Sequence, residues 1–177
     1  MDLRGSKTEE NLRFAFGAES QATNKYEYFA SQAKKQGFEQ IAAIFKETAA
    51  NEREHAKLWF KHLGALGDTA KNLASAAEGE KAEWAEMYPR MANEAEAEGF
   101  LDIAQQMRSV ADVEKMHEER YNTLFGRVQN GTVFSREVKT IWHCRNCGHI
   151  EVGLVAPQVC PTCKHPQAYF EELAENY

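Results

Sequence analysis

Glu52-Arg53-Glu54-His55 and Glu114-Lys115-Met116-His117 are the two stretches that decide the fold of this chain. In each, a carboxylate and an imidazole stand three residues apart, so on an α-helix both side chains leave one face and can bind one metal ion. The second pair falls on a helical stripe whose other members are Ile103, Met107, Val110, Tyr121 and Leu124. An unpaired buried carboxylate is costly, so this stripe calls for a metal ion, a counter-charge or a proton.

Four amphipathic helices are predicted to carry these motifs. Their ranges are about 8–36, 38–63, 69–98 and 100–125, and glycines end the first three. Asp68 or Thr69 is the expected N-cap of the third helix, and Pro89 should kink that helix or open it locally.

The helical part is an internal repeat. Glu19 precedes Glu52 by 33 residues and Glu83 precedes Glu114 by 31, each pair spanning two helices and a glycine stop. Two such hairpins packed face to face would form a four-helix bundle with its carboxylates at one level. The predicted metal ligands are Glu19, Glu52, His55, Glu80, Glu83, Glu114 and His117. Five carboxylates and two imidazoles suit iron or manganese better than four-coordinate structural zinc.

The composition changes after Gly126. Asn130-Gly131 predicts a β-hairpin turn, and β-prone residues then lead into the cysteines. All four cysteines form two Cys-x-x-Cys pairs separated by 12 residues, namely Cys144, Cys147, Cys160 and Cys163. Four thiolates in a tetrahedron suit iron or zinc almost equally. The sequence therefore predicts a helical domain over 1–130 and a small, β-rich, metal-stabilised domain over 131–177.

The motifs of the helical part resemble rubrerythrin. The matching residues are Glu19, Glu52-x-x-His55, Gly79-Glu80-x-x-Glu83-Trp84, Met87-Tyr88-Pro89, Glu98-Gly99-Phe100 and Glu114-x-x-His117 with Glu118-Glu119-Arg120-Tyr121. The resemblance covers nearly the entire chain. It implies a mainly α fold, a ferritin-like four-helix bundle followed by a rubredoxin-like domain.

The resemblance also implies a carboxylate-bridged di-iron centre. Glu52 and Glu114 match the bridging positions, and the other five predicted ligands match the terminal ones. One iron of the family trades a glutamate for a histidine as its oxidation state changes, which corresponds here to Glu83 and His55. Tyr26 and Tyr88 match tyrosines that are expected to hydrogen-bond the ligands.

The cysteine module is similar to rubredoxin. Cys160-Pro161-x-Cys163 and the nearby Trp142, Tyr169 and Phe170 carry that similarity. Lys164 departs from it, because rubredoxins carry glycine after the fourth cysteine. A mononuclear iron is the expected occupant, and a structural zinc ribbon is the alternative.

Family resemblance implies a peroxidase of oxidative-stress defence. Reducing hydrogen peroxide to water takes two electrons, which a diferrous pair can supply. The iron of the four-cysteine site would then return electrons singly from a redox donor, either a rubredoxin or an NADH- or NADPH-dependent reductase. The alternatives are a ferritin-type ferroxidase that handles iron, and a non-catalytic adaptor with a structural zinc ribbon.

Charge and hydropathy exclude several classes of partner. The formal net charge of −6 leaves no basic patch for nucleic acid. No N-terminal apolar segment resembles a signal peptide, and no segment has the ~18 apolar residues of a membrane span, so a cytoplasmic location is expected.

A short connection predicts a domain-swapped homodimer. In ferritin-like topology the second and third helices run parallel, so the chain between them must return along the bundle. Residues 64–71 reach only ~30 Å when extended, which leaves nothing for the lateral offset between helices. The first hairpin of one chain should therefore pack on the second hairpin of another. An up-down-up-down bundle within one chain is the alternative.

Overall fold

The computed structural model describes residues 2–175, so the first residue and the last two of the predicted domains lie outside the described part. The chain divides into two compact units, which meet between Gly67 and Asp68. Within residues 2–175, no helix combines the length and the apolar character needed to cross a bilayer.

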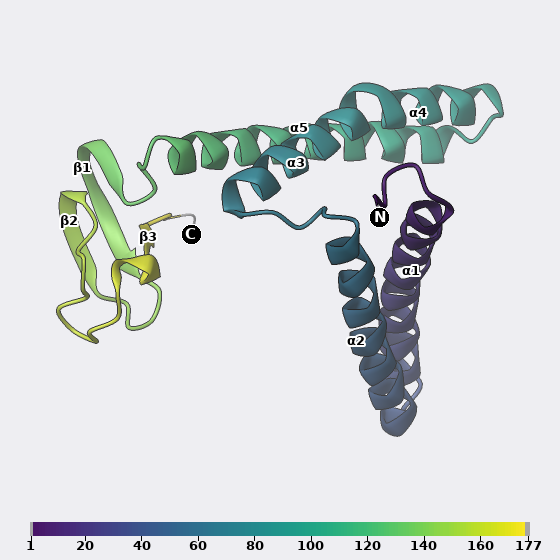
Figure 1. Ribbon diagram of the computed structural model, residues 1–177, viewed down its shortest axis with the longest axis horizontal. Helices are drawn as coiled ribbons and strands as arrows, with labels where there is room; N and C mark the ends of the chain where they lie inside the picture. Colours follow the sequence, from purple (N-terminus) through teal and green to yellow (C-terminus); the bar gives the residue numbers. More distant parts are fainter. Residues whose placement is uncertain (1, 176–177) are drawn as a thin grey trace. The chain divides into compact units, whose positions relative to one another are not determined.

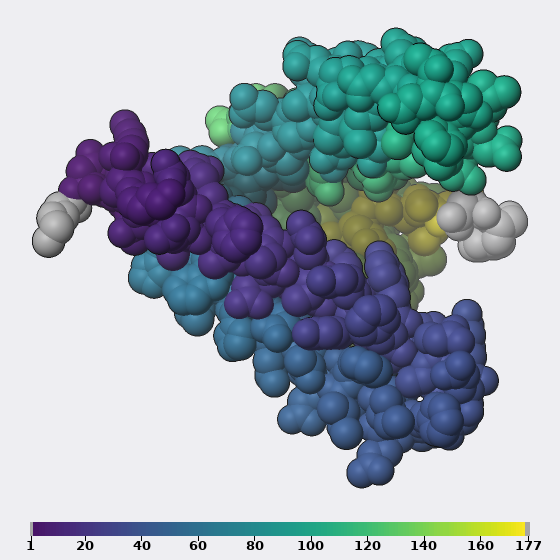
Figure 2. Space-filling view, turned by 90° about the vertical axis from the view of Figure 1, so that its right-hand side faces the viewer, coloured from purple at the N-terminus to yellow at the C-terminus, as the bar shows by residue number. Residues whose placement is uncertain are grey.

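The first unit is a helical hairpin. Helix α1 (Lys7–Lys35) and helix α2 (Glu39–His62) lie side by side along their length (Figures 1 and 2). Gly37, with φ of 82°, allows the sharp reversal between them. The buried residues of the interface are all alanines: Ala30, Ala33, Ala42, Ala49 and Ala56. Small side chains let the two backbones approach closely, which brings acidic residues of α1 near those of α2.

The second unit begins with a second helical hairpin. Helix α3 (Thr69–Ala82), a π-helical turn η1 (Glu83–Met87) and helix α4 (Tyr88–Ala97) run along helix α5 (Leu101–Gln129) (Figure 1). Asp68 caps α3, its carboxylate accepting a hydrogen bond from the N–H of Lys71 at 2.9 Å. The expected local opening at Pro89 is confirmed, because the π-helical turn lies immediately before it. Proline lacks an N–H and clashes with the preceding turn of an α-helix.

The predicted hairpin turn at Asn130-Gly131 is wrong. Helix α5 continues past Phe125 to Gln129, and Asn130 is its C-cap. Gly131, with φ of 65°, donates its N–H to the carbonyl of Val128, and Thr132 donates to Arg127. A left-handed glycine ends a helix as readily as it turns a hairpin, so the dipeptide alone does not distinguish the two.

The chain ends in a small antiparallel sheet of order β2-β1-β3. Its strands are β1 (Ser135–Cys144), β2 (Ile150–Val155) and β3 (Phe170–Glu172), with a short 3₁₀ turn η2 (Gln167–Tyr169) before the last. The core consists of Trp142, Cys144, Ala156, Cys160 and Phe170. Two of these five residues are cysteines, so this core depends on what the thiols bind.

Candidate metal centres

The first cluster of candidate ligands lies within the first hairpin. It contains Glu19 from α1 and Glu52 and His55 from α2. The imidazole Nδ1 of His55 lies 2.9 Å from a carboxylate oxygen of Glu52 and 4.0 Å from one of Glu19. Burial raises the pKa of Glu19, and the neighbouring Glu52 carboxylate raises it further, against a smaller opposing effect of His55.

The second cluster repeats this geometry in the second hairpin. It contains Glu80 from α3 and Glu114 and His117 from α5. The imidazole Nδ1 of His117 lies 2.7 Å from Glu114 and 3.7 Å from Glu80. The pKa of Glu80 is raised by burial and then by the Glu114 carboxylate. In each cluster, therefore, one glutamate is held where protonation is easier than in water.

The counterpart of Glu19 in the second hairpin is Glu80, whereas the sequence repeat had matched Glu19 with Glu83. Glu19 precedes Gly37 by 18 residues and Glu80 precedes Gly99 by 19. A π-helical turn accommodates one extra residue within an α-helix. The turn η1 therefore explains the difference, and it shifts the register that the spacing had predicted.

Glu83 is the one predicted ligand outside both three-residue clusters. It opens the π-helical turn, and its charge still raises the pKa of Glu80 and of Tyr88. Burial is the largest cause of the raised pKa of Tyr88, and the Glu114 carboxylate also contributes. Tyr88 thus lies near two predicted ligands.

Tyr26, the other tyrosine expected to hydrogen-bond a ligand, packs its ring against Phe29 and Phe45. No hydrogen bond from the hydroxyl of Tyr26 or Tyr88 to a predicted ligand is seen within residues 2–175. Such bonds therefore stay a prediction.

The four cysteines converge at one end of the sheet. All four sulfur atoms lie within 4.8 Å of one another. Cys144 and Cys163 are 3.7 Å apart, and Cys147 and Cys160 are 3.6 Å apart. A tetrahedral metal with bonds of ~2.3 Å to sulfur places its ligands ~3.8 Å apart. These distances fit a four-thiolate metal site, and they are far too long for disulfides.

Two knuckles with the same hydrogen bonds hold these sulfurs. Cys144 donates its N–H to the carbonyl of His149 and accepts from Gly148, while Cys160 donates to His165 and accepts from Lys164. Gly148 and Lys164 hold the same left-handed place, with φ of 78° and 62°. Lys164 therefore adopts the conformation that glycine favours.

The electrostatics of the knuckles favour thiolate at some positions. The backbone N–H of His165 lowers the pKa of Cys163 to about 5. At Cys147 the backbone N–H of His149 acts in the same direction, but the neighbouring thiols and burial outweigh it and raise the pKa to about 12. A bound cation would displace the protons from such a group. The donor set thus suits a thiolate-bound iron or zinc.

Comparison with known proteins identifies the family. The family model described as Rubrerythrin matches residues 10–125, and the model described as Rubrerythrin, rubredoxin-like domain matches residues 142–171. The chain belongs to the rubrerythrin family. Rubrerythrins therefore define its fold class, a ferritin-like helical domain followed by a rubredoxin-like one, and its cofactors, a di-iron centre and a four-cysteine metal site. Membership also makes it a member of an oxidoreductase family.

Named rubrerythrins match nearly the full chain. Rubrerythrin of Porphyromonas gingivalis is 48% identical, covering 99% of this chain and 94% of its own length. Rubrerythrin-1 of Clostridium acetobutylicum is also 48% identical, covering 99% and 98%. A solved structure of nigerythrin in its fully reduced, all-ferrous state covers 97% of this chain and 91% of its own, at 29% identity and a TM-score of 0.37.

The rubrerythrin motif also contains a contact that sequence reasoning missed. The indole Nε1 of Trp84 donates to a carboxylate oxygen of Glu118 at 2.6 Å, joining the π-helical turn to α5. Both residues belong to the quoted motifs, but no spacing rule connects positions 34 residues apart. Only the packing of the hairpin reveals the pair.

Proposed function

We propose that this rubrerythrin is a non-haem di-iron peroxidase that reduces hydrogen peroxide to water. The observation that carries the proposal is the combination of two Glu/Glu/His clusters with a four-cysteine site in one chain. The reaction consumes one peroxide, two protons and two electrons and yields two waters. Two irons bound as a diferrous pair supply both electrons, which avoids release of a radical.

The proposed ligand set contains all seven residues predicted from the sequence. Glu52 and Glu114 bridge the two irons, and the terminal ligands are Glu19, His55, Glu80, Glu83 and His117. Five carboxylates carry enough negative charge to bind two divalent ions, and to keep binding them when both become trivalent. Glu83 and His55 exchange at one iron as its oxidation state changes. Tyr26 and Tyr88 act by hydrogen-bonding the ligands.

Electrons reach the bundle domain, residues 1–130, from the thiolate-bound iron of residues 131–177. That iron is in turn reduced by a rubredoxin or an NADH- or NADPH-dependent reductase. A ferroxidase that stores iron has no use for such a thiolate site, so the cysteines favour the peroxidase. Reddish protein with thiolate-to-iron absorption is expected, and a colourless, zinc-loaded tail would contradict the electron relay.

Peroxide consumption with a reduced donor tests the activity. The substitution Glu52→Ala should abolish it, because a bridging carboxylate is lost. The matched control is Glu54→Ala, which removes an exposed carboxylate two residues away whose partner is Lys57. Equal peroxidase rates in both variants would contradict the proposal, and iron oxidation without peroxide turnover would favour the ferroxidase.

We further propose that the protein is a domain-swapped dimer. Helix α2 ends at His62 and α3 begins at Thr69, so the connection spans six residues and reaches ~25 Å. From Glu52 to His62 is ~15 Å of helix, and from Thr69 to Glu80 is ~16 Å. In a bundle with α2 and α3 parallel, the connection is too short to bring Glu52 and Glu80 of one chain to one level. A second copy then supplies the complementary hairpin.

The surface of each hairpin supports this assembly. Ile41 and Ile44 of α2 are 47% and 56% exposed, and Ile103 of α5 is 46% exposed, although all three lie on stripes predicted to be buried. Within residues 2–175, the indole nitrogen of Trp59 is buried without a hydrogen-bond partner. An unpaired buried donor costs ~1–3 kcal/mol, and a packed second hairpin would supply its acceptor.

Mixing two inactive variants distinguishes the assemblies. In a swapped dimer of Glu52→Ala with Glu114→Ala, one centre carries both substitutions and the other carries none. Co-expression should restore about a quarter of the wild-type activity, because half of randomly assorted dimers are mixed and each has one intact centre. The matched control mixes Glu52→Ala with Glu19→Ala, which lie in one hairpin and restore nothing. No recovery in the first mixture would exclude the swap.

A further inference from the structure

The π-helical turn places Glu83 on backbone that the helix alone holds weakly. Tyr88 donates its N–H to the carbonyl of Glu83, five residues back, instead of four. Such a turn is wider than an α-helical one and interrupts the regular ladder of hydrogen bonds. The position of the Glu83 carboxylate therefore depends on what else fixes the turn.

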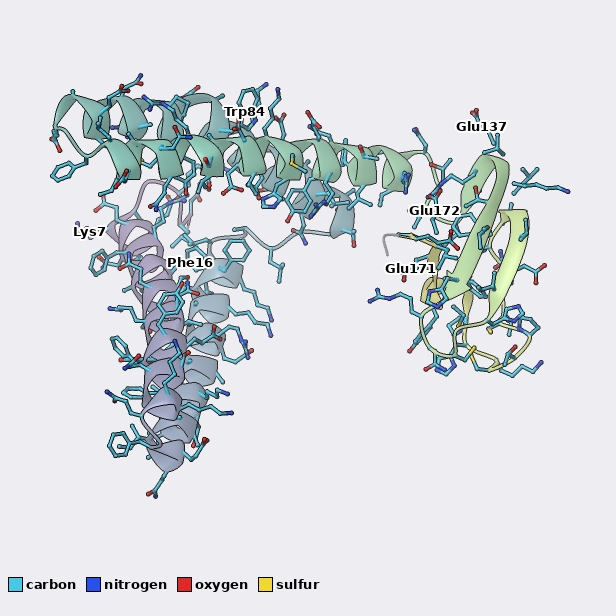
Figure 3. The ribbon with its side chains drawn as sticks, turned by 180° about the vertical axis from the view of Figure 1, so that it is seen from behind. Lys7, Phe16, Trp84, Glu137, Glu171 and Glu172 are labelled. Atoms are coloured by element: carbon cyan, nitrogen blue, oxygen red, sulfur yellow. The ribbon has the colours of Figure 1, made fainter. Side chains whose placement is uncertain are left out.

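A side-chain hydrogen bond ties this turn to α5. Trp84, labelled in Figure 3, donates to Glu118 at 2.6 Å in a partly buried position. Trp84 directly follows Glu83, and Glu118 directly follows His117. The bond thus joins the neighbours of two predicted ligands. It is a hydrogen bond to a charged acceptor, which is stronger than one between neutral groups.

A cation covers the same indole. The ammonium of Lys115 lies 5.5 Å from the centroid of the Trp84 ring. Lys115 directly follows Glu114 on α5. Trp84 is therefore held by α5 at two points, and both lie next to ligands of the second cluster.

The first hairpin has no such device at the corresponding place. Ala56 follows Glu52 by four residues, as Glu118 follows Glu114. Ala56 lines a cavity of about 450 Å³, together with Thr23 and Phe60 among others. In that hairpin Glu19 lies on an unbroken α-helix. Of the two hairpins as described, the indole and its acceptor thus occur in the one whose ligand lies on a π-helical turn.

We infer that Trp84 and Glu118 are positioning residues that hold Glu83 in place for metal binding. Their hydrogen bond fixes the π-helical turn against α5, and so fixes the Glu83 carboxylate relative to Glu114 and His117. The inference rests on the proposed function in one respect, the assignment of Glu83 as a ligand. Glu118 itself touches no metal in this scheme.

Manganese binding to the full-length, metal-free protein tests the inference. Mn²⁺ prefers carboxylate and imidazole to thiolate, so it reports on the helical site, and free Mn²⁺ is counted by its electron paramagnetic resonance. Trp84→Phe and Glu118→Ala should each weaken binding about 10-fold. The double variant should be no weaker than either single one, because both remove the same bond.

Conservative variants separate the bond from charge and from packing. Glu118→Gln keeps an acceptor but loses the charge, so affinity close to wild type supports the hydrogen bond, and affinity like that of Glu118→Ala overturns it. Lys115→Gln, which leaves the bond intact, is the matched control and should change affinity less than Trp84→Phe does. Additive losses in the double variant would also overturn the inference.

Hydrogen exchange of the backbone amides provides a readout without metal. The amides of residues 83–88 should exchange faster in Trp84→Phe and Glu118→Ala, but not in Glu118→Gln. Faster exchange with unchanged Mn²⁺ affinity would show a purely structural role and overturn the inference. Unchanged affinity in Glu83→Ala would instead contradict the ligand assignment of the proposed function.

Discussion

Lys164 has a backbone conformation that its side chain disfavours. A β-carbon in the left-handed region costs ~1–2 kcal/mol. The second knuckle nevertheless needs that conformation, because Lys164 donates its N–H to Cys160 as Gly148 does to Cys144. The ammonium of Lys164 returns to the carbonyl of Pro161 at 2.9 Å, which offsets part of the cost.

Replacing Lys164 by glycine should stabilise the cysteine module. We expect Lys164→Gly to raise its free energy of unfolding by about 1 kcal/mol, because the left-handed strain is removed. Thermal loss of the thiolate-to-iron absorption measures the effect. The matched variant Gly148→Ala should lower stability, since a β-carbon there meets no atom within 4 Å and only the conformational cost remains. A destabilised Lys164→Gly would contradict the prediction.

Glu19 makes the metal-free protein sensitive to pH. Its pKa is raised by burial and by Glu52, so the folded state binds this proton more tightly than the unfolded chain does. The charged form therefore costs stability above the folded-state pKa, and this cost disappears as the pH falls through it. Glu19→Gln should melt above wild type at about pH 7 without metal, and the gap should close toward about pH 5.

Bound metal should reverse that order. A carboxylate that ligates iron stabilises the folded state, and the glutamine variant lacks it. Calorimetric melting of the metal-loaded pair should place Glu19→Gln below wild type at neutral pH. The same order with and without metal would contradict the assignment of Glu19 as a ligand.

At the scale of the elements, the first hairpin depends on small side chains between its helices. Ala49 is 2% exposed at the α1–α2 interface. Ala49→Leu should destabilise the protein by ~1–3 kcal/mol, because the added atoms force the helices apart. Chemical denaturation measures the change. Ala43→Leu is the control, since that alanine is exposed on the same helix and should tolerate leucine. Equal stability of the two variants would contradict close packing there.

Helix existence was predictable from local patterns, whereas one helix end and one turn were not. The stripes and glycine stops placed all four predicted helices. The π-helical turn was only hinted at by Pro89, because its one extra residue appears in the sequence as a difference of spacing to Gly99. Asn130-Gly131 was misassigned because a left-handed glycine fits both a helix C-terminus and a hairpin, and only the length of α5 decides between them.

At the scale of the whole molecule, metal supports the two domains unequally. The β-rich module has a core of only five residues, two of them cysteines. The helical hairpins keep their alanine interface and their backbone hydrogen bonds without metal. A chelator should therefore remove amide protection from β1, β2 and β3 first, while α1, α2 and α5 remain protected. Hydrogen exchange read by mass spectrometry measures this, and simultaneous loss in both domains would contradict it.

The sequence by itself determined the chemistry of this rubrerythrin: the residue types at each metal site, their placement on helices, and the four-cysteine module. Those features follow from helical periodicity and ligand spacing, which are local. Tertiary structure alone decided that Glu80 is the counterpart of Glu19, and that Trp84 reaches Glu118 across the second hairpin. The physical reason is that a π-helical turn and a contact between distant residues both depend on how helices pack, which no local pattern records.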